Sequence, residues 1–174
     1  PVPPTTAAPP TRSEAPAAPE RHRLLAAALA LQPVLIGINA LFHPDVDIEG
    51  ASILAGAAES PTGWYLVHLV AGLGALLGVP AAFALRRLVS ERRRTLRDTA
   101  LGAAIVAGPV LAMAFVAEAA VFHLLADTAV PRGAAVELAE AYTSTPLFFA
   151  VPLSVLASSV AAVLFSVALW RDRI

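Results

Sequence analysis

The sequence predicts an all-α fold, a four-transmembrane-helix antiparallel bundle preceded by a disordered, proline-rich N-terminal tail. Three observations predict it. Of the 174 residues, 57% are hydrophobic and only 14% are charged, whereas a soluble domain is about half apolar and about a quarter charged. The apolar residues gather into four long runs. The arginines lie at the same ends of these runs throughout the chain.

The N-terminal segment differs in composition from the rest. Residues 1–20 hold seven prolines among Ala, Thr, Ser and Glu. Such a segment buries too little apolar surface to offset the ordering of its backbone, so we expect a disordered cytoplasmic tail. It has no apolar central region and is therefore not expected to act as a signal peptide. Residues 21–174 form the predicted transmembrane domain.

Each apolar run is long enough to cross a bilayer as a helix, because ~20 helical residues span a hydrocarbon core of ~30 Å. None alternates as a barrel strand does, which leaves helices as the only candidates. The four predicted helices cover about residues 24–42, 64–85, 100–126 and 146–170.

The first and third links between the predicted helices, residues 43–63 and 127–145, are longer than a bundle needs. Ser60-Pro61-Thr62 indicates the entry to the second helix, and Val136–Tyr142 is expected to form a short helix on the membrane surface. Loops of this size can cover a site.

Charge predicts the orientation. The ten arginines on one side of the predicted membrane are Arg21, Arg23, Arg86, Arg87, Arg92, Arg93, Arg94, Arg97, Arg171 and Arg173. The two long loops contain only Arg132, together with seven acidic residues. By the positive-inside rule we expect a multi-pass protein of the plasma (inner) membrane with both termini in the cytoplasm.

Two missing residue types exclude several chemistries. The chain has no cysteine, which excludes disulfides, thiolate metal sites and cysteine nucleophiles. It also has no lysine, which excludes a Schiff base and a P-loop lysine. The net charge of −1 gives no reason to expect a nucleic-acid partner.

Polar side chains inside the predicted helices are the candidate functional residues. At a rise of ~1.5 Å per residue, the three histidines closest to the long loops fall within the outer third of the membrane. The candidates are Gln32, Asn39 and His43 in or after the first helix, His68 in the second, Glu118 and His123 in the third, and Ser158 in the fourth.

Several site chemistries remain open. His43, His68 and His123 could bind a divalent metal such as zinc or copper. His68 and His123 could instead be axial ligands of a b-type haem. Histidines near an interface also often bond only to loops or water. Glu118 and His123 are five residues apart and point about 140° apart around a helix, so they cannot easily bind one ligand together.

A carboxylate inside the membrane is costly and normally faces a partner or a wet cavity. Glu118 could pair with a histidine, or be a protonated acid bonded to a serine of the fourth helix. With a histidine it could also act as the acid and base of a lipid-directed enzyme, which would make Glu118 catalytic.

Helix packing has its own signals. Gly74 and Gly78 form a GxxxG pair, which favours close packing within the bundle, in a homo-oligomer or against a membrane partner. Each predicted helix also contains a proline in its interior, which removes a backbone hydrogen bond and kinks the helix. These prolines are Pro33, Pro80, Pro109 and Pro152.

The run Leu41-Phe42-His43-Pro44, followed by Trp64 and His68 at Trp-x-x-x-His spacing, resembles a family of small four-helix bacterial membrane proteins of actinobacterial type. The resemblance covers the first two helices and implies no activity or site residue. The sequence therefore predicts a small accessory or interaction subunit without a catalytic motif. An outward-facing metal or haem protein and a lipid-directed enzyme are the alternatives.

Overall fold

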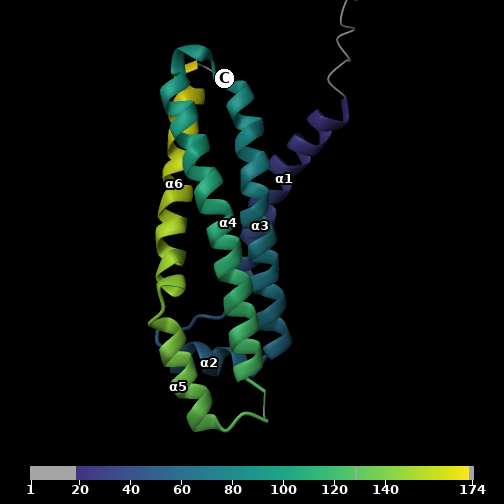
Figure 1. Ribbon diagram of the computed structural model, residues 1–174. Coiled ribbons are helices and arrows are strands. Elements are labelled where there is room, and N and C mark those ends of the chain that lie inside the picture. Colours follow the sequence, from purple (N-terminus) through teal and green to yellow (C-terminus); the bar gives the residue numbers. More distant parts are fainter. Residues whose placement is uncertain (1–18, 128, 173–174) are drawn as a thin grey trace, which may run out of the picture.

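The computed structural model describes residues 19–127 and 129–172 and confirms the all-α prediction (Figure 1). All regular secondary structure in this described part is helical, and it has no β-strand. The predicted disordered tail falls almost entirely on residues 1–18, outside the described residues. The helices are α1 (Pro19–Phe42), α2 (Gly50–Glu59), α3 (Pro61–Leu88), α4 (Arg94–Leu125), α5 (Arg132–Thr143) and α6 (Pro146–Asp172), with a short 3-10 helix, η1 (Glu91–Arg93).

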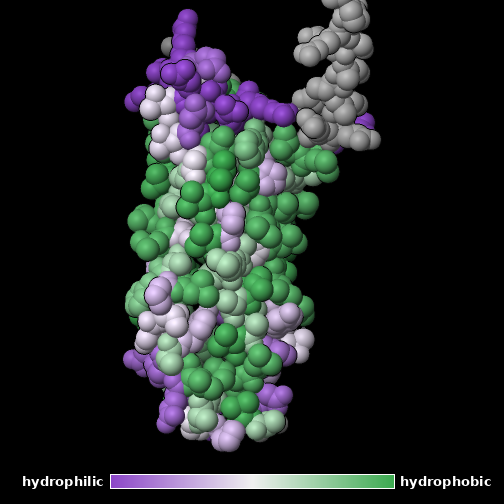
Figure 2. Space-filling model, viewed as in Figure 1, coloured by the Kyte–Doolittle hydropathy of each residue, from purple (hydrophilic) through white to green (hydrophobic). Residues whose placement is uncertain are grey.

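Four of these helices are long and apolar enough to cross a membrane, as the sequence predicted. Their apolar side chains form a broad band on the surface, with a dense polar cap at one end and a mixed end opposite (Figure 2). Many large apolar side chains on α1 and α6 are exposed, among them Leu41, Leu153 and Val163. A surface of this kind is suited to contact with a lipid bilayer.

The long helices pack as an open series rather than as a closed ring. α1 packs on α3, α3 packs on α4, and α4 packs on α6, whereas α1 and α6 have no comparable packing between them. The N-terminal end of α1 also leans away from the other three helices (Figure 1). One side of the bundle is therefore open between its first and last helices.

The helices extend beyond the apolar runs that predicted them. α3 begins at Pro61 rather than Trp64, α4 begins at Arg94 rather than Ala100, and α6 ends at Asp172. Hydropathy detects only the part of a helix that crosses the hydrocarbon, whereas these extra turns are polar. Each of the four prolines lies inside its predicted helix.

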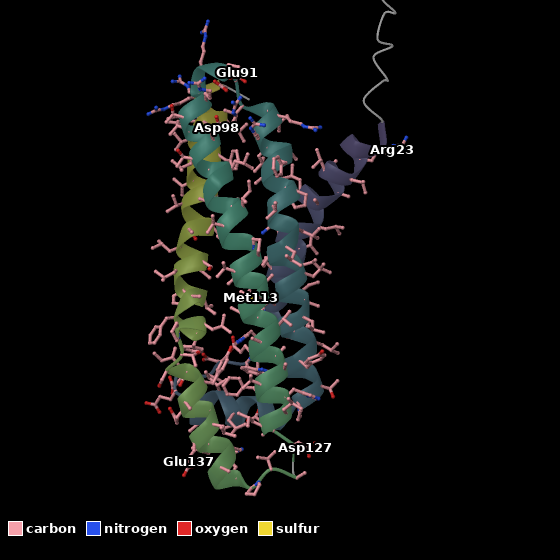
Figure 3. The ribbon with its side chains drawn as sticks, viewed as in Figure 1. Arg23, Glu91, Asp98, Met113, Asp127 and Glu137 are labelled. Carbon is pink, nitrogen blue, oxygen red and sulfur yellow. The ribbon has the colours of Figure 1, made fainter. Side chains whose placement is uncertain are left out.

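Ion pairs hold the polar turns at the arginine-rich end (Figure 3). The buried guanidinium group of Arg97 donates to Glu91 at 2.6 Å and to Asp98 at 3.0 Å. Ser90, in the link between α3 and α4, donates to the carboxylate of Asp172 through its backbone N–H at 2.7 Å and its hydroxyl at 2.9 Å. These contacts join the α3–α4 link to the last turn of α6.

The opposite end carries a small cap of two helices. α5 contains the predicted Val136–Tyr142 segment, whereas α2 lies in a link for which no helix was predicted. The backbone N–H of Ala51 donates to Glu140 at 2.9 Å, and a Cβ on Gly50 would lie 2.5 Å from the carbonyl carbon of Ala139. Ile53, Leu54 and Phe122 fill the core beneath this cap.

The two glycines of the GxxxG pair have different surroundings. A Cβ on Gly74 would lie 3.0 Å from Ile36 of α1, so this glycine permits close packing of α1 on α3. Gly78 has nothing within 4 Å of the same position. The structure thus accounts for Gly74 within one bundle, and a homo-oligomer or membrane partner through this pair stays a prediction.

The closest approach of α3 and α4 depends on Gly108. A Cβ there would lie 2.9 Å from the carbonyl oxygen of Ala75 and 3.0 Å from Val79. Because overpacking costs about 1–3 kcal/mol, we expect Gly108→Ala to lower the thermal unfolding temperature in detergent. Gly102→Ala, in open space on the same helix, should leave it unchanged or raise it slightly. Equal unfolding temperatures for the two variants would contradict this packing.

Candidate functional site

The candidate site lies beneath the α2–α5 cap and starts from a fixed imidazole on α3. His68 and Trp64 are one helical turn apart, and their rings stack with centroids 4.4 Å apart. Nδ1 of His68 donates to the backbone carbonyl of Trp64 at 2.8 Å. The side chain of His68 is completely buried. The hydrogen bond to Trp64 fixes the position of the His68 ring and requires a proton on its Nδ1, because a carbonyl oxygen can only accept a hydrogen bond.

His43 approaches this imidazole from the end of α1. Its ring centroid lies 5.0 Å from that of His68 and 5.4 Å from that of Trp64. Its Nδ1 donates to the carbonyl oxygen of Pro44 at 2.7 Å. The turn at Pro44 therefore fixes His43 just where the chain leaves α1. Its Nε2 is not engaged by this bond.

Glu118 reaches the same place from α4. It is only 8% exposed, and Oε1 lies 3.7 Å from Nε2 of His68, beyond hydrogen-bond distance. That Nε2 has no hydrogen-bond partner among the described residues. Because Nδ1 of His68 carries a proton, a neutral ring presents a lone pair toward Glu118. The contact is therefore favourable when a proton or another donor lies between the two groups.

The structure thus brings together His43, His68 and Glu118 and places His123 elsewhere. Nδ1 of His123 donates to the carbonyl oxygen of Pro61 at 3.1 Å, and its ring lies 5.2 Å from Tyr65. Within residues 19–127 and 129–172, no three His, Cys, Asp or Glu side chains form a group that could hold a metal ion. The metal and haem ligand sets gain no support from this geometry.

The supporting polar residues lie along the open side. Asn39 of α1 donates weakly to the carbonyl oxygen of Val67 on α3 at 3.5 Å. Gln32 and Ser158 line a cavity deeper in the bundle. Ser159 bonds to the carbonyl oxygen of Val155 on its own helix. The neighbour that the structure gives Glu118 is thus a histidine of α3, rather than a serine of α6.

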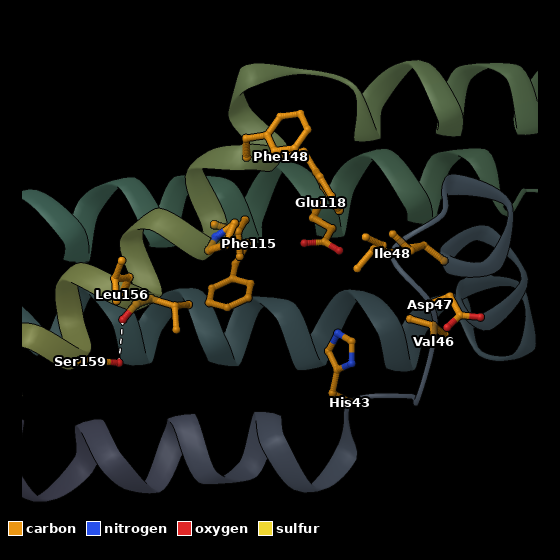
Figure 4. A pocket seen from close by; sticks show the side chains of 14 residues that line it. His43, Val46, Asp47, Ile48, Phe115, Glu118, Phe148, Leu156 and Ser159 are labelled. Carbon is orange, nitrogen blue, oxygen red and sulfur yellow. Dashed lines mark hydrogen bonds between the residues drawn. The ribbon is translucent and has the colours of Figure 1, made fainter.

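A cavity of about 710 Å³ opens in front of Glu118 (Figure 4). His43 and Glu118 enter it from α1 and α4, and Phe115 of α4 lies on its wall. Residues Val46 to Ile48, which follow α1, form its rim. The wall from α6 is largely apolar and consists of Phe148, Phe149, Val151, Pro152, Val155, Leu156 and Ser159.

A second cavity of about 460 Å³ continues this space toward the arginine-rich end. It lies among α1, α3, α4 and α6 and shares Phe115, Val155 and Ser159 with the first cavity. We call the two together the α1–α6 groove. It follows the open side of the bundle, and Glu118 lines the part of it nearer to the α2–α5 cap.

Tyr142 of α5 lies near the carboxyl group of Glu118. Burial raises the pKa of Tyr142 to about 12, and the neighbouring charge of Glu118 adds to the shift. Its buried hydroxyl has no hydrogen-bond partner among the described residues. The ring packs edge-on against Phe122 and Phe148, with centroids 5.6 Å and 6.1 Å away. Tyr142 thus belongs to the aromatic cluster beneath the cap.

Sequence reasoning missed the residues that shape the cavity. Asp47 counted only as a loop charge, and Phe115 and Phe148 only as apolar residues of their helices. Their roles depend on where the link after α1 folds back and on which face α6 turns inward. The three-residue spacing of Phe115 and Glu118, which puts both on one face of α4, was the available signal.

Comparison with protein-family models, curated proteins and solved structures gives no match. The geometry alone defines the class of site, which is an apolar cavity with one buried carboxyl group and an adjacent imidazole in a helical membrane-type bundle.

A buried acid without hydrogen-bonded partners is costly for stability. Replacing buried charged groups with apolar side chains of similar volume is often neutral or stabilising by about 1–4 kcal/mol. We therefore expect Glu118→Leu to keep or raise the thermal unfolding temperature. The control Phe122→Ala, in the same helix and completely buried, should cost about 3–5 kcal/mol. A loss for Glu118→Leu as large as that of the control would assign Glu118 a structural role.

Proposed function

We propose that the chain is a multi-pass protein of the bacterial plasma membrane that binds an amphiphile in the α1–α6 groove. The observation that carries this proposal is the position of Glu118. Its carboxyl group is 8% exposed and forms part of the wall of a largely apolar cavity of about 710 Å³. A polar group at one place in an apolar cavity suits a ligand with one polar end and an apolar remainder.

The size and lining of the cavity support a small ligand. Ligand pockets commonly have volumes of about 300–1,000 Å³ and are lined by apolar and aromatic side chains with a few polar groups. The second cavity extends the apolar space along the bundle by about 460 Å³. An extended hydrocarbon chain fits a space of that form better than a compact solute.

The open side of the bundle supports entry from the membrane. α1 and α6 lack the packing that joins the other neighbouring long helices, so the groove meets the lipid between them. An amphiphile dissolved in the bilayer can reach the cavity sideways while keeping its chain in an apolar environment. This route requires no opening of the α2–α5 cap.

A partner helix is the other possible occupant of an open side, and the predicted accessory or interaction role would use it. Close helix contacts in membranes favour small residues. The outer part of the groove instead has Phe148, Phe149 and Leu156 along α6. Large side chains around a cavity favour a flexible chain as the occupant there.

The distribution of charge supports a topology with both termini in the cytoplasm. The arginines of the α3–α4 link and of the end of α6 gather at one end, where Figure 3 labels Glu91 and Asp98. Asp127 and Glu137 mark the opposite end (Figure 3). By the positive-inside rule the arginine-rich end faces the cytoplasm, so the mouth of the cavity lies in the outer half of the membrane.

Reporter fusions test this topology. Alkaline phosphatase fused after Asp172 should be inactive, and the same enzyme fused after Asp127 should be active, because it folds only outside the cytoplasm. Green fluorescent protein at the same two positions should give the opposite pattern. Active phosphatase at Asp172 together with inactive phosphatase at Asp127 would contradict the proposed orientation.

Filling the cavity tests the proposed binding. Leu156 and Leu153 are both exposed on α6, at 62% and 67%, but only Leu156 lines the cavity. We expect Leu156→Trp to reduce the amount of lipid or other amphiphile that copurifies with the protein by about tenfold, which corresponds to ~1.4 kcal/mol. Leu153→Trp should behave as the wild type does. Mass spectrometry of solvent extracts measures both, and equal retention in the two variants would contradict binding in this cavity.

A further inference from the structure

We propose that the head of the amphiphile is a cation, of the alkylammonium class, and that it binds at Glu118. This inference rests on the proposed function, because it names the chemistry of the ligand that the α1–α6 groove would hold. It begins with the charges around the cavity. The two carboxyl groups that line it are those of Glu118 and Asp47, and neither cavity has an arginine in its lining.

The state of Glu118 supports a cation that carries N–H donors. Its side chain is only 11% exposed, yet it forms part of the cavity wall. Its contact with His68 is 3.7 Å long, and Nε2 of that histidine has no hydrogen-bond partner in the described residues. Among the described residues no group donates a hydrogen bond to Glu118, because His68 uses its Nδ1–H on Trp64 and the buried hydroxyl of Tyr142 has no hydrogen-bond partner. An ammonium group supplies the missing donor together with the opposite charge.

The aromatic wall adds to this preference. Phe115, Phe148 and Phe149 line the same cavity as Glu118, and Figure 4 shows Phe115 and Phe148 among the side chains around it. The faces of aromatic rings attract cations, and more strongly where water is excluded. An ammonium head next to Glu118 therefore meets a carboxylate and aromatic rings, while its chain lies along α6.

The same surroundings disfavour an anionic head. A carboxylate or phosphate in the cavity would face the carboxyl groups of Glu118 and Asp47, and the described lining offers only the imidazole of His43, and no guanidinium group, to balance them. The imidazole of His68 is completely buried and does not line the cavity. Like charges placed together oppose binding, so the ordinary anionic phospholipids are poor candidates for this site.

Three amphiphiles with the same chain test the charge preference. The full-length protein in nanodiscs of a zwitterionic lipid is titrated with dodecylammonium, dodecanol or dodecanoate. The fluorescence of Trp64, which contacts His43 on the cavity wall, reports binding in a Trp170→Phe background. The Leu156→Trp variant, whose cavity is filled, gives the level of non-specific partition into the lipid. Because it has an added tryptophan, its binding is measured by the displacement of radiolabelled dodecylammonium.

We expect dodecylammonium to bind at least about tenfold more tightly than dodecanol, and dodecanoate to bind most weakly. Glu118→Gln keeps the shape of the side chain and should remove most of the advantage of the cation. Asp47→Asn, in the exposed rim, should reduce it by about twofold to threefold because exposed charges contribute little. Glu137→Gln, exposed on α5 and outside the cavity, is the matched control and should change nothing.

The remaining outcomes separate the two proposals. Equal binding of all three amphiphiles, lost in Leu156→Trp, would overturn the cationic head and leave the groove as the binding site. Tightest binding of dodecanoate would overturn the cationic head in the same way. Binding of every amphiphile at the level of the Leu156→Trp variant would overturn both proposals. If Glu118→Gln does not fold, the ranking of the three amphiphiles on the parent protein and the Asp47→Asn result still decide the inference.

Discussion

The burial of the Glu118 carboxyl group is the constraint on which the half of the molecule beneath the α2–α5 cap depends. A carboxylate is costly to hold in an apolar region without a partner, yet Glu118 is 8% exposed and lies 3.7 Å from its nearest imidazole nitrogen. That imidazole is fixed by a stack on Trp64 and a bond to its carbonyl oxygen. The α2–α5 cap and the aromatic residues around Tyr142 then separate the group from water, which leaves the cavity as its open side.

The open series of helices explains why that cavity exists. A closed four-helix bundle would pack α6 on α1 and fill the space in front of Glu118 with side chains. Here α1 is held by α3 alone, through the close approach at Gly74. At the other end, Asp172 fixes the end of α6 to Ser90 in the α3–α4 link. The first and last helices are thereby held apart by contacts to different neighbours, and the groove remains between them.

The sequence was sufficient for the fold and for only part of the site. Hydropathy and length predict the four long helices, because crossing a membrane imposes a composition that is visible without a structure. Depth along the helices grouped His43, His68 and His123, whereas the structure brings His43 and His68 together near Glu118 and places His123 on Pro61 and Tyr65. Depth gives a position along a helix, whereas the rotation of each helix decides which side chains meet. Helix α2 and the rim at Asp47 were missed because both depend on contacts with α5 and α6.

The central claim is that the α1–α6 groove holds an amphiphile whose polar end lies at Glu118. The most direct measurement is an experimental structure of the protein purified in a mild detergent or in native lipid. The account predicts elongated density between α1 and α6 that begins beside the carboxyl group and continues along Val155 and Leu156. Direct packing of α1 on α6, or a helix of another chain in the groove, would contradict it.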